Sequence, residues 1–225
     1  MKKFISILGA SFIWIALIAP ANSGPVGIGF TLQTGKYETS GTETEKTVTS
    51  VTSEQTSKTL EETFLGGSVY AEFRTDNGWA LGVDYVPMNI DLGSGKRTDA
   101  STGADSTSEA DTGDRSASAE IDGLTTIYAH IPVGPVYVLL GYHSAYAKTT
   151  ETLPTSNYDN IAINGTQIGL GMKTEDSRMR AQVSYSDFDA ISLTATGNAA
   201  SGNVTGNNKI TADADALSFT VAFGF

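Results

Sequence analysis

Residues 217–225 read Leu-Ser-Phe-Thr-Val-Ala-Phe-Gly-Phe, with an apolar side chain at every odd position and Ser, Thr, Ala or Gly at every even position. In an extended strand, successive side chains point to opposite faces, so this period of two predicts one apolar face and one face of small residues. Such a strand suits a wall that meets lipid on one side and a tightly packed interior on the other. We therefore expect residues 217–225 to form a β-strand of a membrane barrel.

The first 21 residues have the features of an export signal. Lys2 and Lys3 are followed by an apolar run over residues 4–18, and Ala19-Pro20-Ala21 supplies small residues for a cleavage site. We expect residues 1–21 to be a signal peptide that is removed. The alternative is an uncleaved anchor, but the apolar run is shorter than the roughly 20 residues that span a bilayer comfortably.

Composition excludes several classes of protein. The chain of 225 residues carries a formal charge of -11, and removal of residues 1–21 takes away two lysines and no acid, which changes the charge from -11 to -13. A protein this acidic is a poor partner for nucleic acid. The absence of cysteine from the sequence excludes disulfides and thiol chemistry. Beyond residue 21 there is no long apolar run, so entry into a membrane would require a closed barrel.

Short and long polar connections alternate along the chain. Three are short and rich in turn residues, at 75–78, 132–135 and 174–177. Four are long and contain mostly Ser, Thr, Asn, Gly, Asp and Glu, at about 39–62, about 93–118, about 148–163 and about 194–208. Three short turns and four long loops require eight strands, and this alternation is typical of an outer-membrane barrel with its long loops outside the cell.

The apolar phase can be assigned in each strand candidate. Pro87 interrupts the third candidate, and we expect the outward phase there to change to Met88, Ile90 and Leu92. In the fourth candidate we expect Ile121, Ile127 and Ile131 to point outward. The other expected outward positions are Val26, Ile28, Phe30 and Leu32; Leu65, Val69, Ala71 and Phe73; Trp79, Leu81, Val83 and Tyr85; Val136, Val138, Leu140 and Tyr142; Ile168, Leu170 and Met172; and Met179, Ala181, Val183 and Tyr185.

Aromatic residues fall near the ends of these strands. Phe73 and Trp79 flank the first short turn, and Tyr85 ends the run that Trp79 begins. We expect these three residues to lie at the membrane interface, where aromatic girdles are found. The alternative is a soluble, secreted β-sandwich, which also has strands with a period of two. A sandwich does not account for the export signal, the terminal aromatic strand and the loop asymmetry together.

The mature chain resembles the small eight-stranded outer-membrane barrels of the OmpA/OmpW-like group. The resemblance rests on the alternating loop lengths and on Phe219, Val221, Phe223 and Phe225, which resemble the C-terminal signal that the barrel assembly machinery of Gram-negative bacteria reads. It implies an all-β, up-and-down antiparallel transmembrane barrel over residues 22–225, with its termini in the periplasm. The group includes adhesins, anchors, narrow channels and lipid-modifying enzymes, so the resemblance does not imply one activity.

Charged residues of both signs are expected inside this barrel. An eight-stranded barrel has an interior just wide enough for side chains, and buried charges are costly unless they are paired. One interpretation is a network that closes the lumen; the other is a narrow gated pore for ions or small solutes. The expected lumen network consists of Glu72, Arg74, Asp84, His143, Lys173, Arg178 and Arg180.

The sequence indicates a structural or cell-surface role and no enzyme. Only His130 and His143 are present; His143 is followed by Ser144 and Ala145, so it lacks the His-x-Ser-Asn arrangement of outer-membrane lipid A deacylases. The acidic loops show no calcium-binding spacing, so we expect no metal site and no cofactor. The expected partners are outer-membrane lipid, lipopolysaccharide and the assembly machinery, with an unidentified extracellular ligand as a further option and no nucleic acid.

Overall fold

The computed structural model describes residues 26–46, 53–99, 113–151, 156–174, 178–194, 196–197 and 209–224. The expected signal peptide and Phe225 lie outside these residues. Among the residues described, no helix is long and apolar enough to cross a membrane. The strands are β1 (Val26–Lys46), β2 (Ser53–Arg74), β3 (Ala80–Tyr85), β4 (Ile90–Asp99), β5 (Gly113–Val133), β6 (Val136–Glu151), β7 (Ser156–Asn157), β8 (Ile161–Lys173), β9 (Met179–Thr194), β10 (Thr196–Gly197) and β11 (Lys209–Gly224).

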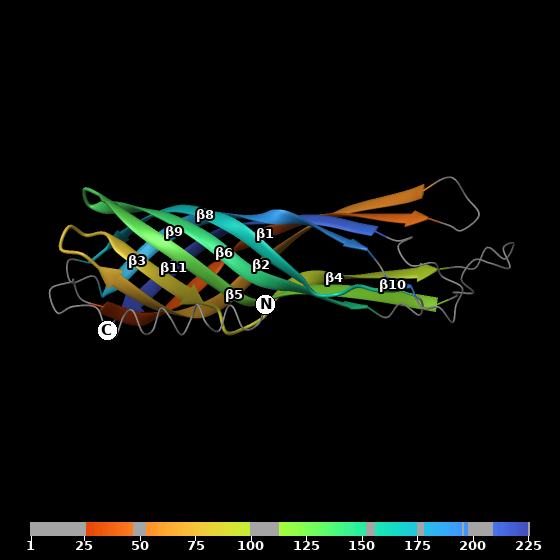
Figure 1. Ribbon diagram of the computed structural model, residues 1–225, viewed down its shortest axis with the longest axis horizontal. Coiled ribbons are helices and arrows are strands. Elements are labelled where there is room, and N and C mark those ends of the chain that lie inside the picture. The colour runs from red at the N-terminus through yellow and green to blue at the C-terminus, as the bar shows by residue number, and fades with distance from the viewer. Residues whose placement is uncertain are drawn as a thin grey trace, which may run out of the picture.

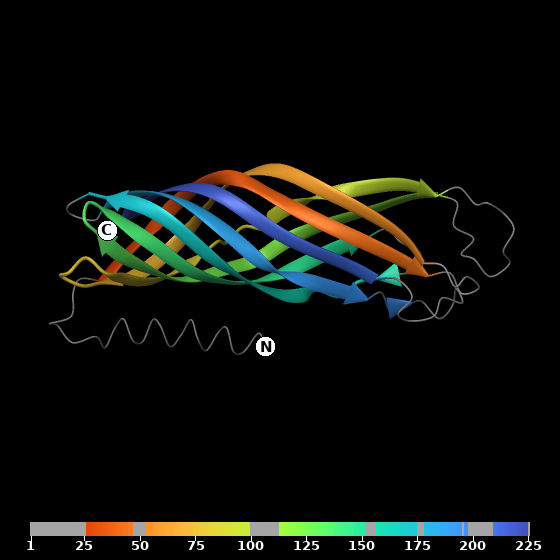
Figure 2. The same ribbon diagram turned by 90° about the horizontal axis from the view of Figure 1, so that it is seen from above.

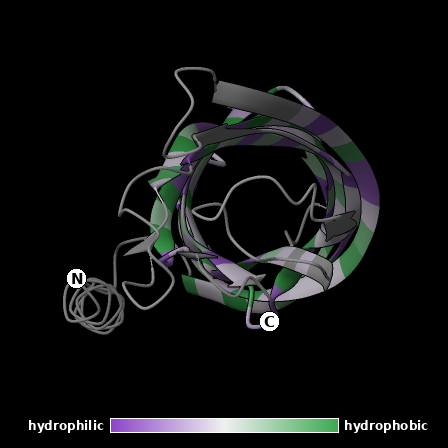
Figure 3. Ribbon diagram, turned by 90° about the vertical axis from the view of Figure 1, so that its right-hand side faces the viewer, coloured by the Kyte–Doolittle hydropathy of each residue, from purple (hydrophilic) through white to green (hydrophobic). Residues whose placement is uncertain are grey.

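The strands close into an antiparallel barrel, as the sequence predicts. Hydrogen bonding runs in the order β3-β2-β1-β11-β9-β8-β6-β5-β4, and an additional pairing of β3 with β5 completes the ring. Because β3 and β4 both pair with β5 and follow each other along the chain, they are two halves of one wall strand, and the barrel has eight. Figures 1 and 2 show the tilted strands, and Figure 3 shows the ring from its end. The closed ring excludes the soluble β-sandwich.

The half of the barrel next to the short turns is apolar on the outside. Leu65 is 83% exposed, and Ile28, Leu170, Val183 and further outward residues on the other strands are also exposed. This arrangement confirms the outward phases expected for the strands around 26–32, 65–73, 79–85, 136–142, 168–172 and 179–185. An apolar outer face over a polar interior is the reverse of a water-soluble protein and is the arrangement that lipid requires.

The other half of the barrel is apolar on the inside. Tyr37, Leu92, Ile121, Leu124 and Phe188 are buried there in one cluster. The expected outward positions of Ile90, Leu92 and Ile121 are therefore wrong. On the outside of this half, charged residues such as Lys36 and Glu61 replace the apolar band. This change of faces is the one expected where a wall leaves lipid and meets water, because apolar side chains then turn inward.

A β-bulge explains the change at Ile121. The pairing of β5 with β6 shifts between Asp122 and Thr125, which adds one residue to β5, and Gly123 adopts a positive φ of 67°. One extra residue reverses the facing of every residue beyond it. Ile127 and Ile131 therefore share the outward phase while Ile121 points inward.

Several segments expected as loops belong to strands. The pairing of β1 with β2 continues to Lys46 and Ser53, so most of the expected loop 39–62 is an extended hairpin, and β4 and β5 form a second hairpin over much of 93–118. Hydroxyl pairs such as Ser40 with Thr59 at 3.0 Å join the first hairpin across its strands. The polar residues of hairpin β1–β2 can form paired strands because the barrel below the hairpin holds the two strands in register.

Candidate functional site

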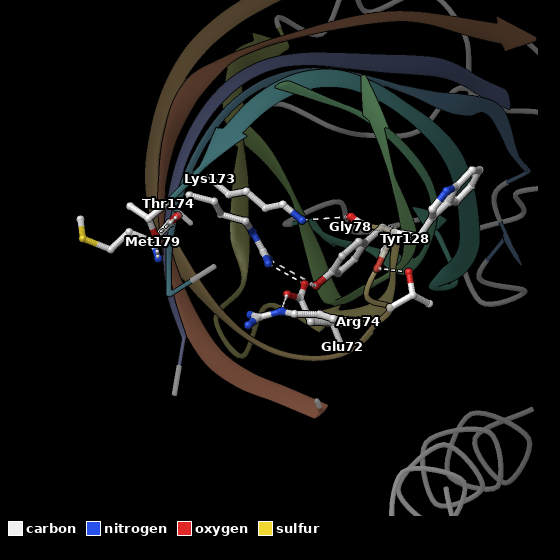
Figure 4. A network of polar contacts seen from close by, with 10 residues as sticks. Glu72, Arg74, Gly78, Tyr128, Lys173, Thr174 and Met179 are labelled. Atoms are coloured by element: carbon white, nitrogen blue, oxygen red, sulfur yellow. Dashed lines mark hydrogen bonds and ion pairs between the residues drawn. The ribbon is translucent and has the colours of Figure 1, made fainter. Parts of the chain in front are cut away.

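A buried charged layer crosses the barrel near the short turns. The Glu72 carboxylate accepts hydrogen bonds from Arg180 Nη1 at 2.6 Å, from the Tyr128 hydroxyl at 2.6 Å and from Arg74 Nε at 2.5 Å (Figure 4). Arg180 Nη2 also donates to the Tyr128 hydroxyl at 3.2 Å. The side chains come from β2, β5 and β9, so these contacts connect opposite sides of the wall. We call Glu72, Arg74, Tyr128 and Arg180 the charged layer.

The strands place these side chains inward because each lies in the phase opposite to the lipid-facing residues. The Glu72 side chain is 3% exposed and the Arg180 side chain 6%. Buried charges at this depth require partners, and the carboxylate has three donors. The Arg180 guanidinium also lies over the Tyr70 ring, with its central carbon 4.1 Å from the ring centroid, which adds a cation–π contact.

Three tyrosines fill the space around the charged layer by lying over glycines of neighbouring strands. Tyr70 is paired in register with Gly29, and a Cβ added to Gly29 would lie 2.7 Å from the ring. Tyr128 covers Gly82 and Tyr137 covers Gly171 in the same manner. Each missing side chain leaves room for a ring against the wall, which is a role that glycine has in strands. These pairs narrow the lumen at the height of the charged layer.

Some polar atoms in this region have no hydrogen-bond partner in the described part of the chain. They are Arg74 Nη2, Arg180 Nε and His130 Nε2. The His130 ring lies between Tyr128 and Tyr137, with centroid distances of 4.8 and 4.2 Å. Buried polar atoms of this kind are usually satisfied by water, so water could reach this part of the lumen.

Two smaller polar groups lie between the charged layer and the apolar cluster. Thr31 and Ser68 share a hydrogen bond of 2.5 Å, and Ser68 donates to Asp84 at 2.6 Å. His143 bonds to Thr126 at 2.8 Å through Nδ1 and to Ser186 at 2.9 Å through Nε2. A cavity of about 80 Å³ extends from the apolar cluster past these groups to Tyr128, His130 and Arg180, which is room for several water molecules.

The structure brings together three of the seven residues of the expected lumen network. Glu72, Arg74 and Arg180 meet in the charged layer, whereas Asp84 and His143 belong to the separate polar groups described above. Lys173 donates to the Gly78 carbonyl at 3.0 Å and so holds the first short turn (Figure 4). Arg178 is exposed ahead of β9 and lies outside the charged layer.

Sequence reasoning left Tyr70, Tyr128 and Tyr137 out of the expected network, although each lies in an inward phase. The sequence signal for these residues is a tyrosine that faces a glycine on the neighbouring strand. This signal can be recognised only when the pairing register of the two strands is known. Of the expected interface aromatics, Trp79 and Tyr85 are exposed and Phe73 is half-buried. The expected assembly-signal residues Phe219, Val221 and Phe223 lie on the outward face of β11, and Phe225 lies outside the described residues.

Charged residues appear on the outer surface where the apolar band ends. On β1 the first is Lys36, which pairs with Glu61 of β2, and this hydrogen bond and the carboxylate charge raise the pKa of Lys36 above 10.5. Lys148 pairs with Asp122 at 2.5 Å. In the part of the chain that the structure describes, no group of three or more His, Asp or Glu residues could hold a metal ion.

Comparison with known proteins identifies the fold. No family model matches the chain, and no curated protein matches it. It is similar to the outer membrane protein AlkL in DMPC bilayers, with a TM-score of 0.50 and 13% identity over 92% of each chain. OprG from Pseudomonas aeruginosa has a TM-score of 0.47 and 10% identity over 91% of this chain and 98% of its own. The likeness to AlkL shows that this chain has the fold of the small outer-membrane β-barrels.

Proposed function

We propose that this chain is a non-conducting outer-membrane barrel with a structural or cell-surface interaction role. The barrel fold and the band of exposed apolar residues around the turn-side half support insertion in a membrane. The proposed orientation places the termini and the short turns in the periplasm. The extended hairpins β1–β2 and β4–β5 then project outside the cell, where they are available to a partner.

The observation that carries this proposal is the charged layer. Glu72, Arg180 and Tyr128 are hydrogen-bonded to one another across the lumen from three different strands. Side chains fill the interior of an eight-stranded barrel, and here the tyrosine–glycine pairs narrow it further. The apolar cluster lines the opposite half of the lumen. A hydrated path for ions would have to pass both the charged layer and the apolar cluster.

The test begins with gel mobility of the detergent-folded chain 22–225, with and without boiling, followed by recordings in planar bilayers. A faster unboiled band with no conductance is the expected result. Discrete conductance steps would contradict the non-conducting role. Absence of a mobility shift, in a protein that stays soluble without detergent, would contradict the membrane location.

A narrow ion channel is the second candidate, and the unpartnered atoms Arg74 Nη2, Arg180 Nε and His130 Nε2 favour it because they could contact water in the lumen. In a channel gated by exchange of the ion pair, Arg180→Ala should raise the conductance. Unchanged, near-zero conductance of this variant would argue against the channel.

The proposed role is non-catalytic and needs no cofactor. We expect the mass spectrum of lipid A to be the same in cells with and without this protein, because the His143 and Ser186 pair lies inside the barrel, away from the lipid-facing surface. Loss of an acyl chain from lipid A that depends on the protein would contradict this expectation. The proposed partners are lipid and lipopolysaccharide around the wall and the barrel assembly machinery during insertion.

A further inference from the structure

The loop-side half of the barrel consists of two four-stranded sheets. Backbone pairing between β8 and β9 ends at Gly165 and Phe188, and pairing between β2 and β3 ends at Val69 and Tyr85. Beyond these points the described parts of β2, β1, β11 and β9 form one sheet, and those of β8, β6, β5 and β4 form the other. Figure 1 shows the orange strands of the first sheet diverging from the green strands of the second. We call these two sheets the leaves.

A β-bulge explains why β9 separates from β8. Between Phe188 and Ile191, β9 has one residue more than the stretch of β11 that pairs with it. A bulge bends its strand and increases the local twist, so β9 continues along β11 while β8 continues along β6. Among the described residues, 158–164 and 189–194 therefore form no ladder pair with each other. We call this opening in the ladder the gap.

Beyond the gap the two leaves are joined again by β7 and β10. These two strands form a ladder of two residue pairs, which connects the chain ahead of β8 with the chain after β9. Tyr158, which follows β7, is 3% exposed and packs against the buried Leu193 of β9. The Thr149 hydroxyl of β6 donates to the Tyr158 carbonyl at 3.4 Å. We call β7, β10 and the contact of Tyr158 with Leu193 the clasp.

His143 lies at the inner end of the gap. It is paired in register with Gly165, and its ring is stacked on Phe188 with the centroids 5.2 Å apart. The side chain is buried and lines the cavity of the lumen together with Ser186. Separation of the leaves along the gap would therefore expose His143 and the cavity.

On the opposite side of the barrel the leaves contact each other through side chains. Leu60 of β2 lies against Gly93 of β4, where an added Cβ would be 3.4 Å from Leu60 Cδ1. Tyr37 of β1 donates a hydrogen bond to the Asp91 carbonyl of β4. In the described part of this half, the pairing of β7 with β10 is thus the only ladder that joins one leaf to the other.

We propose that the clasp is a conformational device that holds the leaves together, and that its release opens the lumen to the solution outside. Each leaf has continuous ladders, whereas the two leaves share one short ladder and apolar side-chain contacts. Separation of the leaves breaks far fewer backbone hydrogen bonds than unravelling of either one, so it is the local opening of lowest free energy. The charged layer lies on the other side of the cavity and stays closed in this motion.

Chemical modification of His143 provides the first test. The reagent is diethyl pyrocarbonate, which acylates unprotonated imidazole, and the protein is the folded chain 22–225 in nanodiscs. Tyr158→Ala removes the ring that packs on Leu193, so His143 should react about ten-fold faster than in wild type, because truncation of a buried side chain lowers local stability. Mass spectrometry of the His143 peptide measures the rate. Equal rates in the variant and in wild type would overturn the proposal.

The matched control is Tyr146→Ala. Tyr146 lies on β6 between the buried Ala145 and Ala147, in the outward phase, so it takes no part in the clasp. The rate at His143 should be that of wild type in this variant. A rate as high as that of Tyr158→Ala would overturn the specific role of the clasp.

A disulfide across the clasp provides the opposite perturbation, since the sequence contains no cysteine. The two double variants are Ser156→Cys with Gly197→Cys and Asn157→Cys with Thr196→Cys, which replace the two backbone pairs of the ladder. Hydrogen-bonded and non-hydrogen-bonded pairs alternate, so one of the two has the shorter Cα separation of about 4.5 Å that suits a disulfide. The oxidised form should react at His143 about ten-fold more slowly than the reduced form. Equal rates, or failure of both variants to crosslink, would overturn the proposal.

Gel mobility separates opening of the leaves from unfolding of the barrel. The unboiled Tyr158→Ala variant should retain the fast band of the wild type while His143 reacts faster. Loss of this band together with the faster reaction would indicate global unfolding and overturn the proposal. Planar bilayer recordings test the non-conducting role independently, because conductance steps would contradict that role and leave the ratio of modification rates unchanged.

Discussion

Replacement of Arg180 by Met tests the charged layer most directly. The variant leaves the Glu72 carboxylate, 3% exposed, without the donor at 2.6 Å from Arg180. Removal of one partner from a buried ion pair costs about 3–5 kcal/mol. Because Arg74 and Tyr128 still donate to the carboxylate, we expect a loss near the lower limit, about 3 kcal/mol in the free energy of unfolding.

Urea unfolding of the folded chain 22–225 in lipid vesicles can measure this loss. Trp79 is the single tryptophan of residues 22–225, and its fluorescence reports unfolding. The double variant Glu72→Gln with Arg180→Met removes both charges. Its loss in the free energy of unfolding should therefore be smaller than the sum of the losses of the two single variants. We expect a coupling energy of about 1–3 kcal/mol.

Lys58→Met is the control, since Lys58 is an exposed cation of β2 and lies outside the charged layer. Its effect should be within about 0.5 kcal/mol. A loss below about 1 kcal/mol for Arg180→Met, or strictly additive losses with Glu72→Gln, would refute the argument that Arg180 neutralises a buried carboxylate.

Three further predictions concern other parts of the wall. Gly82→Ala should destabilise the barrel by about 1–3 kcal/mol because the added Cβ would overlap the Tyr128 ring. Gly95→Ala should leave the stability unchanged because the space around its Cβ is open. A comparison of the urea midpoints of the two variants tests this prediction. Leu170→Arg should cost about 2–4 kcal/mol in vesicles if that residue faces the lipid core, and equal stability with Leu170→Ser would count against this placement. The pKa of Lys36 is raised in the folded state, so its ion pair stabilises the fold below pH 10.5, and this stabilisation is lost as the pH rises through the folded pKa. The difference in urea midpoint between wild type and Lys36→Met should therefore disappear at alkaline pH. A difference that stays constant with pH would exclude the ion pair.

The barrel itself could be predicted from the sequence because its turn-side half repeats one rule. Lipid outside and packed side chains inside impose the same period of two on every strand, from Val26 to Phe223, and loop lengths give the number of strands. The candidate site was predicted in part for the same reason. Glu72, Arg74 and Arg180 all lie in inward phases, but which of the inward charges meet depends on strand register and height.

The facing of the apolar residues in the loop-side half was predicted wrongly because the surroundings of the wall change along each strand. Ile90, Leu92 and Ile121 were expected outward because apolar residues were assigned to a lipid-facing phase, yet in this half the apolar residues lie inside, as expected for a wall with water outside. The bulge at Gly123 adds a second reversal that no local pattern of hydrophobicity records.

The sequence by itself therefore determined the closed wall, its eight strands and the inward phase of Glu72, Arg74 and Arg180, because each of these follows from the alternation of side chains along one strand. Only the tertiary structure decided that Glu72 reaches Arg180 across 108 residues of sequence, that the tyrosines lie over glycines, and that the ladder opens between β2 and β4. Those features depend on the register between strands, and register is a property of the closed ring.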